Sequence, residues 1–411
     1  MMDDYMTTPI SNAKYTKSGE LKIFSKEVFD FVNFYNSDGY LITGDAPYKY
    51  FSSKRLIVIS SCKIEKYGAI DYIFGYGNIY IMQYSSIEET YCAYVKYTKT
   101  PSVIYVEPDV TIDLGKQSLP KLTLHEPNTQ HSWGFDYLRC KDAFDYILHN
   151  KSIDELPEIV VGVIDDGVES VGSVLGNRLL AAHSFVGDSS QAQISNMGHG
   201  AKVCSVLMEN TLENVKVVSY KIFSERETAL AILRLAEIQA ELDGVDIVNS
   251  SYGMFVKFES RLQKALHIAS AGNVKCNVPQ YPAACDGVVS VAGITKDGML
   301  SDTSTFGDWV NVAAPSESIK LPSIYGVDEY GDFSGTSCAT PFVTSVCAMI
   351  KTQYPDVNNQ QIKEVLYSSC NKANIPVQHG IVNMFNAVTY LDGRNTKEID
   401  FRRADKELIT V

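Results

Sequence analysis

The sequence lacks the features that identify three large classes of protein. No apolar stretch approaches the roughly 18 to 20 residues that a membrane-spanning helix needs. No CxxC pair is present, which argues against zinc and thioredoxin-type sites. Basic residues are in deficit, because 36 Lys and Arg face 49 Asp and Glu, for a formal net charge of −13. Since phosphate binding requires clustered cations, we expect no nucleic-acid partner. The lack of a long apolar stretch likewise predicts no membrane span.

The cysteines do not form the pattern of a disulfide framework, because nine of them are scattered over 411 residues. Cys276 and Cys285 bracket a short loop, and either a disulfide in an oxidising compartment or two small buried thiols would fit. The first 20 residues are polar, with no apolar run and no small-residue cleavage site, so as written they carry no secretion signal.

Composition divides the chain into five segments. With 45% hydrophobic residues, the chain can bury a sizeable core. A stretch of Gly and Pro amid Lys, Ser and Thr separates two patterned regions and is typical of a linker. The expected segments are an N-terminal extension (1–52), a small α+β domain (53–110), a linker (111–130), a large α/β domain (131–391) and a charged C-terminal tail (392–411).

The small domain shows alternating strand and helix signals. β-rich runs predict strands over 55–60, 78–84 and 102–109. Helical patterns occupy 64–74 and 86–98, and the second begins with a capping serine followed by two acidic residues. This βαββαβ-like order favours a ferredoxin-like split-βαβ sandwich.

The large domain contains near-continuous runs of Val and Ile that alternate with helical patterns. Such runs indicate strands buried on both faces, as in a mostly parallel sheet flanked by helices. The fold class predicted here is α/β, with strands expected over 159–164, 215–219, 245–249 and 287–292.

One serine lies where a long apolar helical pattern begins. Gly335-Thr-Ser-Cys-Ala-Thr-Pro341 places Ser337 at this point, with the proline in the first turn, where its missing N–H costs little. The dipole and the backbone N–H groups of a helix start favour a nucleophile and can hold an oxyanion. Taken alone, Ser337 could equally be a helix-capping serine.

Only one of the seven histidines stands in a pattern that suits a general base. His199 lies between two glycines at the start of a helical pattern, so its ring can project into a cleft, although a capping role fits this motif by itself. The other six occupy less suggestive places: His125 and His131 in the linker region, His149 at the end of a polar helix, His183 after two alanines, His267 in an apolar helix and His379 in a turn.

An aspartate ends one of the buried strands. Asp165 is followed by Asp166 and Gly167. A carboxylate at that edge of an open α/β sheet can hold an imidazole in the required tautomer. A turn-capping or metal-binding aspartate would fit the same pattern, and Asp166 is expected to point away and to be structural.

The three motifs together resemble the subtilisin family (subtilases). Asp165, His199 and Ser337 follow the family's order, and the resemblance covers about Trp133 to Leu391. It implies a three-layer subtilisin-like fold and a serine endopeptidase that works through an acyl-enzyme. In this scheme Ser337 is the nucleophile, His199 the general base and Asp165 the group that orients the base. An esterase would need a Gly-x-Ser-x-Gly motif, which the serine lacks.

Further site residues follow from the same resemblance. Asn273, at the end of Ala-Ser-Ala-Gly-Asn, is expected to donate its side-chain amide to the oxyanion. An extended substrate is expected to contact Ser251, Tyr252 and Gly253, because backbone pairing at a strand edge is a general mode of peptide capture. The resemblance therefore implies protein or peptide substrates and no cofactor.

Departures from the family limit what the resemblance implies. The loop after His199 is short and no carboxylate stands about nine residues after Asp165, so neither the family's calcium site nor another metal site is expected. The short loop at 273–282, which shapes the pocket for the residue before the scissile bond, has no acidic residue, so a preference for basic residues there is not supported. The alternative function is a catalytically weak or inactive scaffold that binds peptides.

The small domain resembles the family's inhibitory propeptide, especially over 101–109. The resemblance implies a zymogen in which this domain is an intramolecular inhibitor and the chain cleaves itself within about Thr111–Lys121. An inhibitory propeptide favours export, so an extracellular location is expected, with the cytoplasm as the alternative.

Overall fold

The computed structural model describes residues 53–75, 79–113, 131–149, 151–169, 175–186, 189–195, 197–224, 227–255, 257–260, 262–321 and 332–392. The expected N-terminal extension, most of the expected linker and all but the first residue of the expected tail lie outside these ranges.

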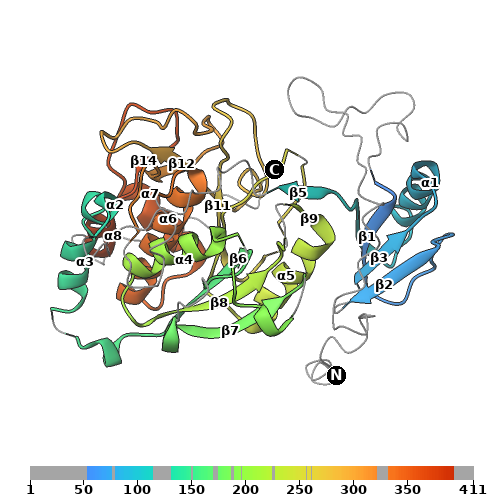
Figure 1. Ribbon diagram of the computed structural model, residues 1–411, viewed down its shortest axis with the longest axis horizontal. Coiled ribbons are helices and arrows are strands. Elements are labelled where there is room, and N and C mark those ends of the chain that lie inside the picture. Colours follow the sequence, from blue (N-terminus) through green and yellow to red (C-terminus); the bar gives the residue numbers. More distant parts are fainter. Residues whose placement is uncertain are drawn as a thin grey trace, which may run out of the picture.

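The N-terminal part forms a four-stranded antiparallel sheet with one helix (Figure 1). The strand order is β2-β3-β1-β4, and α1 (Ile87–Tyr97) connects β3 to β4. Ser86 caps α1, as expected, since its Oγ accepts a hydrogen bond from the Glu89 N–H at 3.1 Å. The strands are β1 (Arg55–Ser60), β2 (Asp71–Gly75), β3 (Ile79–Gln83) and β4 (Val103–Pro108).

The helix predicted over 64–74 is wrong. The chain turns at Tyr67 and Gly68, which both have positive φ angles, and Asp71–Gly75 then forms β2 against β3. Tyr, Ile and Phe are residue types that strands favour. Among the described residues the small sheet therefore has one helix, where a ferredoxin-like βαββαβ order would have two.

The large domain is built on an eight-stranded sheet in which every neighbouring pair is parallel (Figure 1). All four predicted strands are present, and the α/β fold class is confirmed. In sheet order the strands are β14 (Gly380–Ile381), β13 (Val312–Pro315), β12 (Val289–Ile294), β11 (Leu266–Ser270), β10 (Ile247–Ser250), β6 (Ile159–Asp165), β8 (Val215–Lys221) and β7 (Leu179–Ser184).

Both faces of the large sheet are buried, which makes three layers. Ile247 packs in the hydrophobic core that contains α4 and α6, while its neighbour Val248 packs in the core that contains α5. This alternation explains the near-continuous Val and Ile runs, because each face needs its own apolar side chains. The remaining helices and short elements are α2 (Trp133–Tyr137), α3 (Cys140–Ile147), α4 (His199–Glu209), α5 (Leu230–Asp243), α6 (Thr336–Gln353), α7 (Asn359–Ser368), α8 (Met384–Thr389), three 3-10 turns (Ile153–Glu155, Gly176–Arg178, Ser189–Gln191), β5 (Thr111–Asp113) and β9 (Glu227–Ala229).

The small sheet packs against the outer side of α5 (Figure 1). Ile57, Ile79, Ile81 and Val110 share one hydrophobic cluster with the buried residues of α5. Next to this contact, β5 pairs antiparallel with β9, which directly precedes α5. The N-terminal part is therefore joined to the large domain by both apolar packing and strand pairing.

Two expectations for single residues are corrected. His267 lies in β11 rather than in a helix, and it is buried between the hydroxyls of Ser260 and Ser250. Cys276 and Cys285 are free thiols, so the disulfide alternative is not found. Among the described helices, none combines the length and apolar character that crossing a bilayer requires.

The contact of α2 with α6 predicts a steric effect on stability. A Cβ added at Gly134 would lie 2.3 Å from Cζ of Phe342, which is fully buried. We expect Gly134→Ala to lower the free energy of unfolding by about 1–3 kcal/mol, the usual cost of overpacking. Urea unfolding followed by circular dichroism measures this change. The effect should shrink in a Phe342→Leu background, whereas equal losses in both backgrounds would contradict a clash at this ring.

Candidate active site

The candidate site lies at the carboxyl edge of the large sheet. β6 ends at Asp165, its neighbour β10 ends just before Ser251, and β11, the next strand beyond β10, ends two residues before Gly272. His199 is the first residue of α4 and Ser337 the second residue of α6, and these two helices pack against each other. Strand ends and helix starts thus bring together residues that are far apart in the sequence, as expected for an open α/β sheet.

Asp165 and His199 form a buried ion-pair arrangement. Nδ1 of His199 lies 2.7 Å from Oδ1 and 2.9 Å from Oδ2 of Asp165. Nε2 of the same ring is buried and has no hydrogen-bond partner among the described residues. The ring meets Phe333 edge-on, with centroids 6.0 Å apart. The imidazole is therefore oriented at one nitrogen and available at the other.

Burial and pairing shift the pKa values of both partners. Burial raises the pKa of Asp165 to about 6, although the nearby His199 opposes this shift. For His199, burial lowers the pKa, but the charge and hydrogen bond of Asp165 outweigh it, so the net pKa lies above the ordinary 6.5. The neutral ring, whose Nε2 can accept a proton, is consequently the main form only above that raised value.

Asp166 holds the loop that carries His199. Its carboxylate accepts hydrogen bonds from Ser195 Oγ at 2.6 Å and from the N–H groups of Met197 and Gly200, both at 2.7 Å. A structural role is expected for Asp166 from the sequence, but these particular hydrogen bonds are not. The bonds cross about 30 positions of the sequence, which no local pattern could reveal.

Gly200 allows the helix start to approach the strand end. A Cβ on Gly200 would lie 1.8 Å from the carbonyl oxygen of Gly167 and 3.0 Å from Cβ of Asp165. No side chain fits there, so the glycine after His199 is required for the Asp165–His199 contact.

The Ser337 hydroxyl faces the residue that follows β10. Its Oγ donates to the carbonyl oxygen of Ser251 at 2.7 Å, and Oγ of Ser251 donates back to the carbonyl oxygen of Ser337 at 3.0 Å. Ser337 is 3% exposed. Since Nε2 of His199 has no partner among the described residues, the two side chains share the site without a direct hydrogen bond in this structure.

Asn273 is anchored by its side-chain oxygen. Oδ1 accepts hydrogen bonds from the N–H of Thr336 at 2.8 Å and from its Oγ1 at 3.0 Å. Gly335, with φ of +107°, makes room, since a Cβ there would lie 3.1 Å from Nδ2 of Asn273. Thr336 was not singled out from the sequence, but it fixes the orientation in which the amide NH2 group remains the donor.

The residues expected to contact substrate continue from the end of β10. Ser251 is held by Ser337, and Gly253 lies two residues further along. The side chain of Tyr252 points into the protein, where it is 1% exposed and packs on Phe223 with ring centroids 5.7 Å apart. Contacts of Tyr252 with a peptide would therefore be made by its backbone.

Comparison with known proteins places this site in a family. The model of the subtilase family matches residues 157–387, more than half of the chain. A thermostable alkaline protease from Halalkalibacterium halodurans is 25% identical over 303 residues, which cover 69% of this chain and 77% of that protein. Thermitase from Thermoactinomyces vulgaris is 28% identical over 253 residues, which cover 56% of this chain and 88% of thermitase.

A solved structure supports the fold. The epidermin leader peptide processing serine protease (EpiP) of Staphylococcus aureus, crystallised as a mutant, superimposes with a TM-score of 0.61 at 17% identity. The superposition covers 81% of this chain and 98% of that chain. The three-layer arrangement is therefore the subtilisin-like fold.

The Asp165–His199 pair predicts how the imidazole titrates. Replacing Asp165 by Asn removes the charge that raises the pKa of His199 and leaves the burial that lowers it. We expect the ring to titrate above pH 6.5 in the original chain and below pH 6.5 in the variant. NMR of histidine-labelled protein measures both, with His199→Gln to assign the signal and the other rings as internal controls. An unchanged titration would contradict the pairing.

Proposed function

The chain belongs to the subtilase family and is a subtilisin-like serine endopeptidase, and we propose that it cleaves peptide bonds through an acyl-enzyme on Ser337. The observation that supports this assignment is the buried contact of Asp165 with Nδ1 of His199, which leaves Nε2 without a partner beside the start of α6. A serine hydroxyl needs such a base to become a nucleophile.

His199 acts as the general base and later as the general acid. Rotation about the Cα–Cβ bond of Ser337 moves its hydroxyl from the carbonyl oxygen of Ser251 toward Nε2 of His199, and side chains move between such staggered positions readily. Nε2 takes the proton as Oγ attacks the scissile carbonyl and returns it to the leaving amine. Asp165 stabilises the imidazolium and remains ionised.

Two donors bind the negative charge that develops on the carbonyl oxygen. One is the side-chain NH2 group of Asn273, oriented by Thr336. The other is the backbone N–H of Ser337, which lies in the first turn of α6, where N–H groups have no partner within the helix. Donors fixed before the reaction stabilise the oxyanion without reorganisation.

The substrate binds as an extended strand along Ser251, Tyr252 and Gly253. Backbone pairing suits many sequences, because it uses groups that every peptide has. The pairing positions the residue before the scissile bond next to Ser337, since Ser251 contacts this serine directly.

The N-terminal domain, residues 53–110, acts as an intramolecular inhibitor in this proposal. Three contacts support it: the apolar packing on α5, the pairing with β9 of β5, which directly follows this domain, and the carboxylate of Asp109, which accepts the N–H of Ala231 at 2.9 Å in the first turn of α5. β5 begins the expected processing region Thr111–Lys121, of which residues 114–121 lie outside the described ranges. A tethered inhibitor acts at high effective concentration until it is cut.

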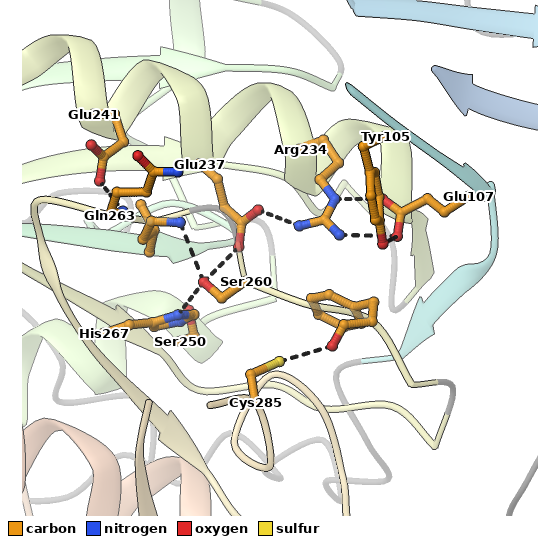
Figure 2. Close-up of polar contacts among 12 residues, drawn as sticks. Tyr105, Glu107, Arg234, Glu237, Glu241, Ser250, Ser260, Gln263, His267 and Cys285 are labelled. Carbon is orange, nitrogen blue, oxygen red and sulfur yellow. Dashed lines mark hydrogen bonds and ion pairs between the residues drawn. The ribbon is translucent and has the colours of Figure 1, made fainter. Parts of the chain in front are cut away.

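A buried arginine joins this domain to α5, as Figure 2 shows. Arg234 is 0% exposed. Its Nε and Nη2 donate to the two carboxylate oxygens of Glu107 at 2.7 and 3.0 Å, and its Nη1 donates to Glu237 at 2.8 Å. Glu107 belongs to β4, so one of the two carboxylates that pair with this buried cation comes from the N-terminal domain. A buried, bidentate arginine of this kind is typical of the energetic centre of an interface.

The polar contacts continue from Glu237 to Ser250, the last residue of β10 (Figure 2). Ser260 donates to Glu237 and contacts Nδ1 of His267 at 2.8 Å, while Nε2 of His267 contacts Ser250 at 2.9 Å. Burial lowers the pKa of His267 to about 3, so the ring is neutral and links the two hydroxyls. Ser250 precedes the substrate-binding segment, and the N-terminal domain is thus connected to the site by hydrogen bonds.

We propose that the protein is exported and acts outside the cell. A domain that inhibits until it is removed protects the producing cell, which suits a protease that acts outside. The cytoplasm is the alternative location, and N-terminal sequencing of the protein recovered from culture medium and from cells distinguishes the two.

The proposed nucleophile is tested by Ser337→Ala. We expect this variant to lose labelling by a fluorophosphonate probe and to lose peptide hydrolysis, while Asn273→Ala keeps labelling but loses about 10²–10³ in kcat, a magnitude that comes from subtilisin itself. Mass spectrometry after incubation should show an N-terminus within Thr111–Lys121 for the original chain and an intact N-terminus for Ser337→Ala. Peptide binding without labelling in the original chain would support the inactive scaffold instead.

The inhibitory contact is tested by Glu107→Gln. Removing one carboxylate leaves Arg234 buried with an incomplete partner set, which weakens the docking of the N-terminal domain. We expect the uncut chain, resolved on a gel, to react with the fluorophosphonate probe at least about tenfold faster, which corresponds to about 1.4 kcal/mol.

The matched control removes an exposed ion pair. Lys141→Met breaks the pair with Asp145, in which both side chains are largely exposed, and should leave labelling unchanged. Arg234→Met should resemble Glu107→Gln, because both break the same contact. If the uncut Glu107→Gln chain labels no faster than the original, this contact does not contribute to inhibition.

A further inference from the structure

A glutamine side chain lies between the two segments that flank Ser337. Gln280 is 6% exposed. A Cβ added to Gly272 would lie 2.2 Å from both Nε2 and Oε1 of Gln280, and a Cβ added to Gly253 would lie 3.1 Å from its Oε1. The amide therefore rests against both glycines, and neither position has space for a side chain.

The backbone holds Gln280 in this place. Met254 and Tyr281 form an antiparallel bridge, with hydrogen bonds of 2.9 and 2.8 Å in the two directions. The bridge holds the segment that contains Gln280 alongside the segment that contains Gly253. The position of the amide is thus set by main-chain pairing and not by a flexible loop alone.

The amide nitrogen of Gln280 is unsatisfied. Nε2 is buried and has no hydrogen-bond partner among the described residues. A buried donor without a partner is unfavourable, so a group that supplies an acceptor gains from meeting it.

The neighbours of Gln280 indicate which group this is. Gly272 precedes Asn273, and its N–H donates to Oγ1 of Thr336 at 3.1 Å; Thr336 directly precedes Ser337. Gly253 ends the segment along which the substrate is proposed to lie. A substrate side chain that meets the amide beside these two glycines therefore belongs to the residue whose carbonyl Ser337 attacks.

We propose that Gln280 selects substrates with a short, uncharged, hydrogen-bonding side chain before the scissile bond: Ser, Thr or Asn. This inference rests on the proposed function, since it assigns a wall of the same cleft. The bulk of Gln280 shortens the pocket and excludes Phe, Tyr and Leu. Its N–H group favours a side chain with an acceptor oxygen. A charged side chain is disfavoured, because a neutral amide does not compensate the burial of a full charge.

The test is a cleavage profile on a peptide library prepared from a digested proteome, read by mass spectrometry. For the original chain we expect Ser, Thr and Asn to precede the cut at least about tenfold more often than Phe, Tyr or Leu. Gln280→Ala removes both bulk and donor and should move the profile toward Leu and Phe. Gln280→Met keeps the bulk without the donor, so it should still exclude Phe but lose the preference for Asn over Ala.

The outcomes separate this proposal from the proposed function. A profile rich in Phe, Tyr or Leu for the original chain, or one that Gln280→Ala and Gln280→Met both leave unchanged, would overturn the role of Gln280 while peptide hydrolysis stands. Cleavage that persists in Ser337→Ala would instead overturn the proposed nucleophile. The profile of the original chain decides the question even where a variant does not fold, and fluorophosphonate labelling reports folding of the site in each variant.

Discussion

The structure of the site depends on one buried carboxylate. Asp165 ends a strand that has side chains packed on both faces, so its charge is removed from water and requires partners inside the protein. Nδ1 of His199 supplies the main one. This requirement extends outward, because His199 can reach the strand only if Gly200 packs on Gly167 and if the loop before it is held by Asp166.

The parts that the sequence predicted well are those set by local pattern. Runs of Val and Ile predicted the parallel strands, since burial on both faces leaves no room for alternation. Each proposed catalytic residue stands in a short motif at a strand end or helix start. The failures have a different origin. The sequence predicts helices where the structure has β2 and the strand around His267, because both segments carry mixed apolar patterns and their pairing partners lie elsewhere in the chain. Contacts across distant positions, such as those of Asp166, leave no local trace.

A second buried charge obeys the same rule with a different consequence. Arg234 is as completely buried as Asp165, but one of its two carboxylate partners comes from the N-terminal domain. A buried charge is stable only while its partners remain in contact with it. If the N-terminal domain leaves, Arg234 on α5 loses one of its two carboxylate partners. Apolar packing alone would hold the two parts together less specifically, since many apolar surfaces are compatible and few carboxylates fit a fixed guanidinium.

Asp166, Arg234, His199 and Gln280 differ in how completely their buried polar atoms are hydrogen-bonded. Asp166 and Arg234 have their hydrogen bonds completed by other parts of the chain, and they hold structure. Nε2 of His199 and Nε2 of Gln280 are buried and have no partner among the described residues; the first ring contacts Asp165, and the amide rests against Gly253 and Gly272. Folding alone does not favour such groups, because each loses its water without a replacement. In the proposed function this cost is offset when a substrate arrives, since the reacting hydroxyl can bond to the imidazole; in the role proposed for Gln280, the side chain before the scissile bond can bond to the amide.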